Sequence, residues 1–145
     1  MPRIPRSQLD DGFFHATARG NCGSSLFVDD LDRLDFLQLM RSTADLFLWR
    51  CYAYCLMGTH YHVVLSASRA ALSDGMRRLN GTYARHFNKR HGQRGHLFEE
   101  RFSSFVIQDE RHLQTAVEYV LHNPVRAGLC RRAVDWKWSA SAVRD

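Results

Sequence analysis

Residues 46–65 read Leu-Phe-Leu-Trp-Arg-Cys-Tyr-Ala-Tyr-Cys-Leu-Met-Gly-Thr-His-Tyr-His-Val-Val-Leu, and this stretch decides the fold. It holds two apolar runs, residues 46–57 and 60–65, and the first is rich in aromatic side chains. Such runs are typical of strands, and Gly58-Thr59 between them is typical of a chain break. The stretch therefore predicts a β-hairpin.

Another strand is predicted before the hairpin, because two sets of side chains alternate over residues 13–19. One face carries Phe14, Ala16 and Ala18, and the other carries Phe13, His15, Thr17 and Arg19. A fourth strand is predicted after the hairpin over residues 97–107, which contain Phe98, Phe102, Phe105 and Val106.

Three helices are predicted between and after these strands from apolar residues spaced three and four apart. The first begins at Asp29 or Asp30 and carries the stripe Leu31, Leu34, Leu37, Met40 and Ala44. The second carries Leu72, Met76, Leu79, Tyr83 and Phe87. The third runs from Asp109 to His122, is stopped by Asn123-Pro124, and carries Leu113, Val117, Val120 and Leu121.

The element order β-α-β-β-α-β-α predicts an α+β fold, a ferredoxin-like antiparallel sheet with helices packed mainly on one face. The chain has 145 residues, of which 45% are hydrophobic. This length and composition predict a single domain over residues 1–145. The four cysteines form no C-x-x-C pair, so we expect reduced thiols.

The charge balance indicates a polyanionic partner, because 20 Lys and Arg against 15 Asp and Glu give +5. Nucleic acid and an anionic membrane surface both fit this balance. No run of 18 apolar residues exists, which excludes a membrane span. The first six residues carry no apolar signal core, so we expect a cytoplasmic protein.

His60 and His62 form an H-x-H pair on the predicted hairpin. Side chains alternate across a strand, so both imidazoles project from one face and Tyr61 from the other. Two neutral imidazoles at this spacing can hold one divalent cation, although chance is an equally good explanation in a chain with eight histidines.

Tyr119 lies off the apolar stripe of the third helix, and Asn123 falls on the same flank four residues later. On spacing alone, a ring lying at the surface explains Tyr119 better than a nucleophile beside a metal does. Asn123 is either a helix cap or an oxygen ligand. By contrast, Tyr83 lies within an apolar stripe and is expected in the core.

Residues 77–94 carry six Lys and Arg and no acidic residue, which favours phosphate contact over a merely solvated helix face. We expect the acidic stretch of residues 29–35 to face away from such a ligand. The candidate DNA contacts are Arg19, Arg77, Arg78, Arg85, Lys89, Arg90, Arg94 and Arg126.

Several segments together resemble the single-tyrosine HUH transposases, particularly the REP-associated tyrosine transposases of bacteria. The matching pieces run in family order over residues 14–21, 56–65, 83–92, 95–98, 118–129 and 136–139. The resemblance implies a ferredoxin-like nuclease fold with His60 and His62 binding Mg²⁺ or Mn²⁺, Asn123 as third ligand and Tyr119 as nucleophile. It implies cleavage and rejoining of single-stranded DNA near a hairpin through a 5′-phosphotyrosine intermediate, by a monomer or a homodimer that exchanges the tyrosine helix.

Two departures from the family pattern are visible. Gly58-Thr59 stands where relatives commonly carry Pro-Asn, and the chain ends soon after Trp138, where many relatives continue with a basic tail. Two other functions stay open: a non-catalytic nucleic-acid binder, and a zinc hydrolase using His60, His62 and Cys55.

Overall fold

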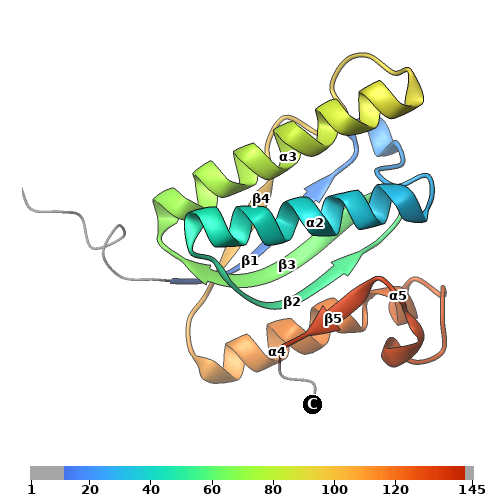
Figure 1. The fold of residues 1–145 in the computed structure, drawn as a ribbon. Coiled ribbons are helices and arrows are strands. Elements are labelled where there is room, and N and C mark those ends of the chain that lie inside the picture. The colour runs from blue at the N-terminus through green and yellow to red at the C-terminus, as the bar shows by residue number, and fades with distance from the viewer. Residues whose placement is uncertain (1–11, 143–145) are drawn as a thin grey trace, which may run out of the picture.

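A five-stranded antiparallel sheet organises the chain in the computed structural model, which describes residues 12–142 (Figure 1). The residues that predicted no signal segment, 1–6, lie outside the described part. The strand order is β4-β1-β3-β2-β5. The strands are β1 (Gly12–Arg19), β2 (Arg50–Leu56), β3 (His60–Ala67), β4 (Ser103–Ile107) and β5 (Ser139–Ser141).

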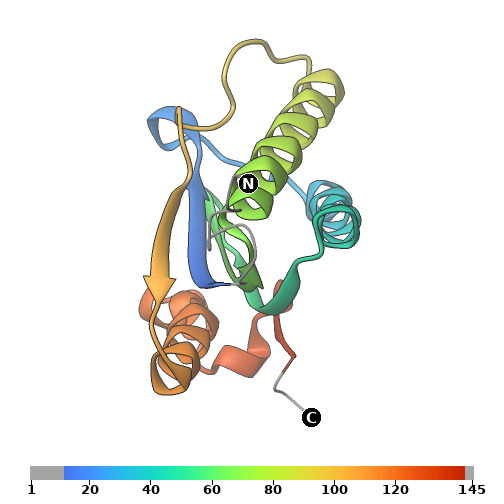
Figure 2. The same ribbon diagram turned by 90° about the vertical axis from the view of Figure 1, so that its left-hand side faces the viewer.

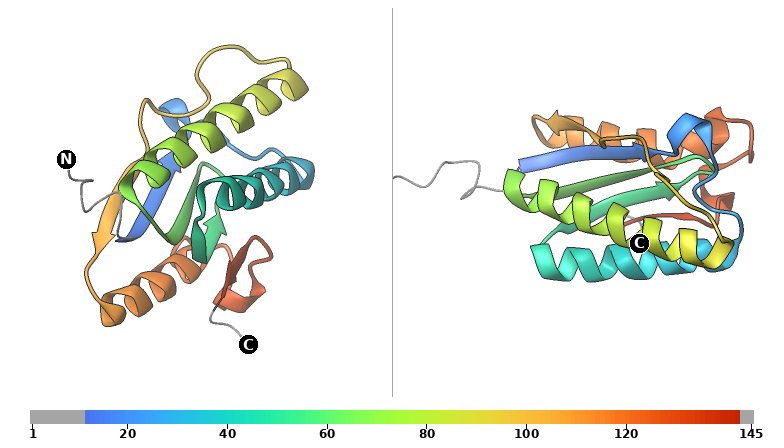
Figure 3. Two further views of the ribbon diagram at one scale, coloured as in Figure 1. Left: turned by 60° about the vertical axis from the view of Figure 1, so that its left-hand side comes forward. Right: turned by 90° about the horizontal axis from the view of Figure 1, so that it is seen from above.

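Helices cover both faces of this sheet, as Figures 2 and 3 show. The two long helices α2 (Asp30–Phe47) and α3 (Arg69–His91) lie on one face, and α4 (Glu110–Leu121) lies on the other. The shorter elements are η1 (Asn21–Gly23), α5 (Asn123–Arg126) and η2 (Ala133–Asp135). The predicted α+β, ferredoxin-like fold with helices mainly on one face is confirmed.

Strand β3 lies at the centre of the sheet, which explains its nearly continuous apolar sequence. It pairs with β1 on one side and with β2 on the other, and all of it after His60 is buried. The predicted hairpin is therefore present, although α2 continues to Phe47 and β2 begins only at Arg50. A strand buried on both faces needs apolar side chains at successive positions.

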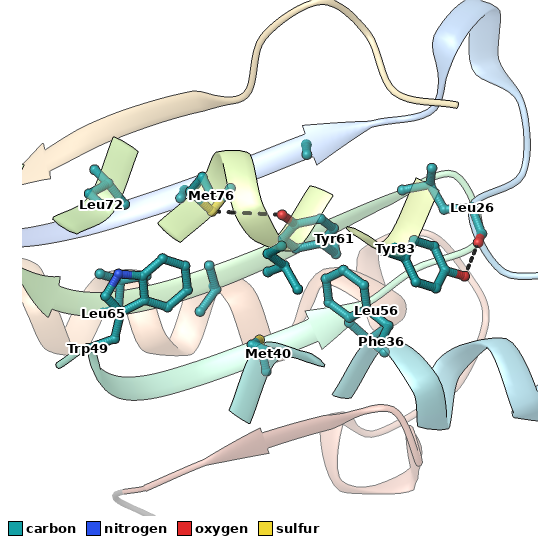
Figure 4. Close-up of a cluster of buried hydrophobic side chains, with 14 of the residues drawn as sticks. Leu26, Phe36, Met40, Trp49, Leu56, Tyr61, Leu65, Leu72, Met76 and Tyr83 are labelled. Carbon is teal, nitrogen blue, oxygen red and sulfur yellow. Dashed lines mark hydrogen bonds between the residues drawn. The ribbon is translucent and has the colours of Figure 1, made fainter. Parts of the chain in front are cut away.

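The larger core lies between the sheet and the helix pair α2–α3 (Figure 4). Tyr61 and Tyr83 are fully buried in it. The Tyr61 hydroxyl donates to Asn80 Oδ1 at 2.6 Å, and the Tyr83 hydroxyl donates to the Leu26 carbonyl oxygen at 2.5 Å. Each phenol is thus satisfied inside the core, as buried polar groups require. The expected core position of Tyr83 is confirmed.

The predicted apolar stripe of α2 is wrong in part. Leu31 and Leu34 are exposed, and the buried residues of this helix are Asp32, Phe36, Met40 and Thr43. Asp32 is tolerated in this face because its carboxylate accepts hydrogen bonds from the Val28 backbone N–H and from side chains of α3. All five stripe residues predicted for α3 are buried, as expected.

A smaller core lies between α4 and the opposite sheet face, formed by Val64, Ile107, Ala116, Val117 and Val120 with their neighbours. Because the apolar side of α4 packs on the sheet, the other sides of this helix face solvent or lie beside the sheet surface. As predicted, α4 ends before Asn123-Pro124. This dipeptide also begins α5, which was not predicted. Across residues 12–142, no helix combines the length and apolar character that crossing a bilayer requires.

Candidate functional site

A row of imidazoles lies on the sheet face that carries α4. His60 and His62 project from β3 on this face, with ring centroids 5.1 Å apart. Tyr61 between them is buried in the opposite core, as strand alternation predicts. The two rings therefore lie close enough to share one ligand, as the H-x-H spacing indicated.

A third imidazole, His15 of β1, joins this row and was not singled out from the sequence. A hydrogen bond of 2.9 Å links His15 Nε2 to His62 Nδ1. A second bond, of 3.2 Å, links Thr59 Oγ1 to His60 Nδ1. Within residues 12–142, no hydrogen bond engages Nε2 of His60 or His62. Both pair members are thus oriented through Nδ1, which leaves Nε2 of each available to a ligand.

Burial disfavours protonation along the histidine row. Burial is the main cause that lowers the pKa of His62 to about 3, and His15, His60, Arg19 and Arg126 add to it. Burial also lowers the pKa values of His60 and His15. Neutral imidazole is the form that coordinates a metal ion, so the environment favours the ligand form of the pair.

Tyr119 lies on α4 beside this row. Its side chain is 51% exposed, and its ring centroid is 6.1 Å from that of His15, which in turn bonds to His62. Because the apolar stripe of α4 packs on the sheet, Tyr119 falls on the flank that faces the histidines. The phenol is accessible to a substrate, unlike the phenols of Tyr61 and Tyr83.

Arg126 fixes the position of Tyr119. Its guanidinium carbon lies 3.9 Å from the centroid of the Tyr119 ring, and its Nη2 donates to the Tyr119 carbonyl oxygen at 2.5 Å. The turn α5, begun at Asn123-Pro124, brings this side chain back over α4. Sequence spacing offered no signal for this contact, because the pattern predicted an end of the helix there.

Three buried polar atoms have no hydrogen-bond partner among the described residues: Thr17 Oγ1, Arg33 Nε and Asn123 Nδ2. Thr17 is the β1 residue directly opposite His62. The nitrogen and oxygen of an Asn side-chain amide exchange places when the amide rotates by 180°. In the rotated orientation, Asn123 would present Oδ1 as an acceptor at the buried position that Nδ2 now occupies. Two imidazole nitrogens and an amide oxygen form a donor set that fits a divalent cation.

A zinc site built on Cys55 is not supported. Within residues 12–142, no three His, Cys, Asp or Glu side chains form a group that could hold a metal ion. The Cys55 thiol is fully buried and donates to Met57 Sδ at 3.7 Å. Burial raises the pKa of this thiol to about 12, which disfavours the thiolate that zinc requires.

Part of the predicted basic surface lines a groove of about 1080 Å³ between α3 and the segment of residues 92–102. Arg77, Arg85 and Arg101 contribute to its walls, together with Phe98 and Phe102. The other positively charged candidates lie elsewhere: Arg78, Lys89 and Arg94 are exposed on α3 or just after it, Arg19 ends β1 opposite His60, and Arg126 covers Tyr119.

The acidic stretch does not face away from the basic segment, as we expected. Arg90 pairs with Asp29 and Asp32, each at 2.6 Å, and Asp35 lies 2.9 Å from His86. The N-terminus of α2 packs beside the C-terminal part of α3, so these opposite charges meet. Among the predicted DNA contacts, Arg90 is therefore the one whose guanidinium is already engaged by carboxylates.

A family model described as "Transposase IS200 like" matches residues 11–123, which include His15, the H-x-H pair and Tyr119 and end at Asn123. The chain belongs to this family. The IS200-like match covers most of the chain and every element of the site except the turn that carries Arg126.

One curated relative is a protein of Haemophilus influenzae (strain ATCC 51907 / DSM 11121 / KW20 / Rd) assigned as a REP-associated tyrosine transposase. It is 23% identical over an alignment of 118 residues, and the match covers 73% of this chain and 66% of the relative. The chain thus spans slightly less than two thirds of that relative's length.

Two solved structures share the fold of this IS200-like transposase family member. A REP-associated tyrosine transposase bound to a REP hairpin superposes with a TM-score of 0.75 at 18% identity, over 96% of this chain and 82% of that one. A Deinococcus radiodurans protein assigned as a transposase superposes with a TM-score of 0.56 at 16% identity, over 82% of this chain and 95% of that one. At these identities the structures bear on the fold alone.

Proposed function

We propose that this chain is a metal-dependent transposase that nicks and joins single-stranded DNA near hairpins through a covalent 5′-phosphotyrosine intermediate. The observation that carries the proposal is the position of Tyr119. Its phenol is open to solvent on the flank of α4 beside His15, which bonds to His62, in a chain of the IS200-like transposase family.

In the proposed reaction, Tyr119 Oη attacks the scissile phosphorus. The bond from phosphorus to the 3′ oxygen breaks, and a 3′ hydroxyl leaves with a proton, while the phenol loses its own. The 5′ phosphate is then joined to Tyr119, and attack by a 3′ hydroxyl reverses the bond. The phosphodiester bond is conserved in the intermediate, so rejoining needs no external energy source.

His60, His62 and Asn123 would hold the cation, Mg²⁺ or Mn²⁺, in keeping with the metal dependence general in this family. When bound, such a cation polarises the phosphate and neutralises charge that develops during displacement. The chain's own contribution is orientation: His15 and Thr59 fix the two imidazole rings, and burial keeps them neutral.

The proposed DNA partner is a hairpin with single-stranded flanks. A solved structure with this fold was determined bound to a REP hairpin, which supports the same class of ligand here. The arginines of the α3 groove would contact phosphates, as would Arg19 and Arg126 beside the site.

The test is adduct formation with a labelled pool of hairpin oligonucleotides whose single-stranded flanks are randomised. With Mn²⁺ or Mg²⁺ we expect a covalent protein–DNA product that survives denaturation. Tyr119→Phe should abolish the adduct and retain DNA binding, whereas Tyr52→Phe, a half-buried control on β2, should leave the adduct intact.

Each alternative has a distinct outcome. An adduct that persists in Tyr119→Phe would show that the nucleophile is another residue. Salt-sensitive DNA binding without an adduct under either metal would favour a non-catalytic nucleic-acid binder.

A further inference from the structure

An exposed phenylalanine continues the row of rings on the histidine face. Phe105 lies on β4 directly opposite His15, and their ring centroids are 6.0 Å apart. Its side chain is 59% exposed, and it is the one exposed phenylalanine among residues 12–142. The row therefore runs from Phe105 through His15 to His62 and His60, with Tyr119 beside His15.

The position of Phe105 is not explained by packing. β4 is the outermost strand on its side of the sheet, and an edge strand usually carries charge rather than open aromatic surface. The Phe105 ring and the exposed Tyr119 ring flank His15 on the same face, and such an open aromatic surface is of the kind that a ligand covers. The neighbouring groups specify what kind of ligand that is.

The surroundings fit a nucleotide. Arg19 and Arg126 lie close enough to the histidines to act on the pKa of His62, so phosphate-binding charge is present on this face. On the other side of the same strand, Ser104 lines the groove that also contains Arg77 and Arg85. A strand of DNA held in that groove would cross the β4 edge at Phe105 to reach Tyr119.

We propose that Phe105 is a stacking platform for one unpaired base of the DNA strand next to the scissile phosphate. Aromatic side chains bind unpaired bases in this way with little sequence preference, because every base presents a flat π-face. The stacked base would fix the register of the backbone relative to Tyr119. The proposal rests on the proposed function, but it concerns binding and is tested without cleavage.

The experiment compares two ligands of equal charge: a fluorescent oligothymidylate of about 20 nucleotides and an abasic phosphodiester of the same length. Binding to the full chain is measured by anisotropy in EDTA, which prevents metal-dependent cleavage. Phe105→Leu should weaken oligothymidylate binding about 10-fold and leave abasic binding unchanged. Phe105→Trp should restore oligothymidylate binding.

Val106→Ala is the matched control, because Val106 is the next residue on β4, is also exposed, and points to the opposite face. It should leave both affinities unchanged. Equal affinities of wild type and Phe105→Leu for oligothymidylate would overturn the proposal, as would an equal loss for both ligands. If only the catalytic proposal fails, no adduct forms, but Phe105→Leu still weakens oligothymidylate binding and leaves abasic binding unchanged.

Discussion

Acidification should destabilise the fold through His62. Its imidazole is only 7% exposed, and its pKa is lowered from 6.5 to about 3, mainly by burial. Between these values the unfolded chain binds a proton that the folded chain does not, so the free energy of unfolding falls as pH falls through this window. Well above pH 6.5 both states are neutral at this residue, and its contribution no longer changes.

The size of the effect follows from the shift. One pH unit inside the window is worth up to about 1.4 kcal/mol for one such group. Lowering the pH from 6.5 to 5 should therefore cost about 2 kcal/mol through His62. His15 and His60 shift in the same direction and add to the loss.

The assay is urea unfolding in EDTA at several pH values between 5 and 7. We expect His62→Gln to reduce the loss of stability on acidification by about 2 kcal/mol relative to wild type. His96→Gln, at an exposed position after α3, is the control and should keep the wild-type profile. A His62→Gln profile parallel to that of wild type would refute the claim that a buried neutral imidazole is maintained at this point.

Three further outcomes follow from burial and packing. Iodoacetamide at pH 8, followed by peptide mass spectrometry, should label the exposed Cys22 well before Cys55, whose pKa is raised to about 12 by burial; equal rates would contradict the described burial. Gly75→Ala should destabilise α3 by about 1–3 kcal/mol in thermal unfolding, because the new Cβ would lie 2.4 Å from Trp49 Cζ2. Gly81→Ala, whose nearest contact is 3.6 Å away, should instead stabilise the same helix by up to about 1 kcal/mol, and a loss there would show that the contact distances do not decide the sign.

Much of the fold was predictable because strand alternation and helical spacing are local patterns. The H-x-H pair, the buried Tyr61 and the off-stripe Tyr119 all follow from the periods 2 and 3.6. The prediction was wrong where the local pattern allowed a helix to bury a different face, as in α2. In α2 the helix turns Asp32 inward and leaves Leu31 exposed. The buried Asp32 carboxylate is stabilised because Arg90 and His91 of α3 hydrogen-bond to it.

The parts of the site that the sequence did not predict depend on tertiary register. His15 alternates onto the correct face of β1, but its bond to His62 depends on how β1 and β3 are aligned. The contact of Arg126 with Tyr119 requires α5, which begins where the sequence predicted only the end of a helix. The three-residue strand β5 is too short for any period to reveal it.

The most direct test of the central claim is mass spectrometry of the full chain after incubation with hairpin DNA and Mn²⁺. We expect a mass gain equal to the 5′-phosphorylated cleavage product less one water, and the modified peptide should carry it on the phenol of residue 119. A gain mapped to another side chain would contradict the account, and so would DNA cleavage that leaves the protein mass unchanged.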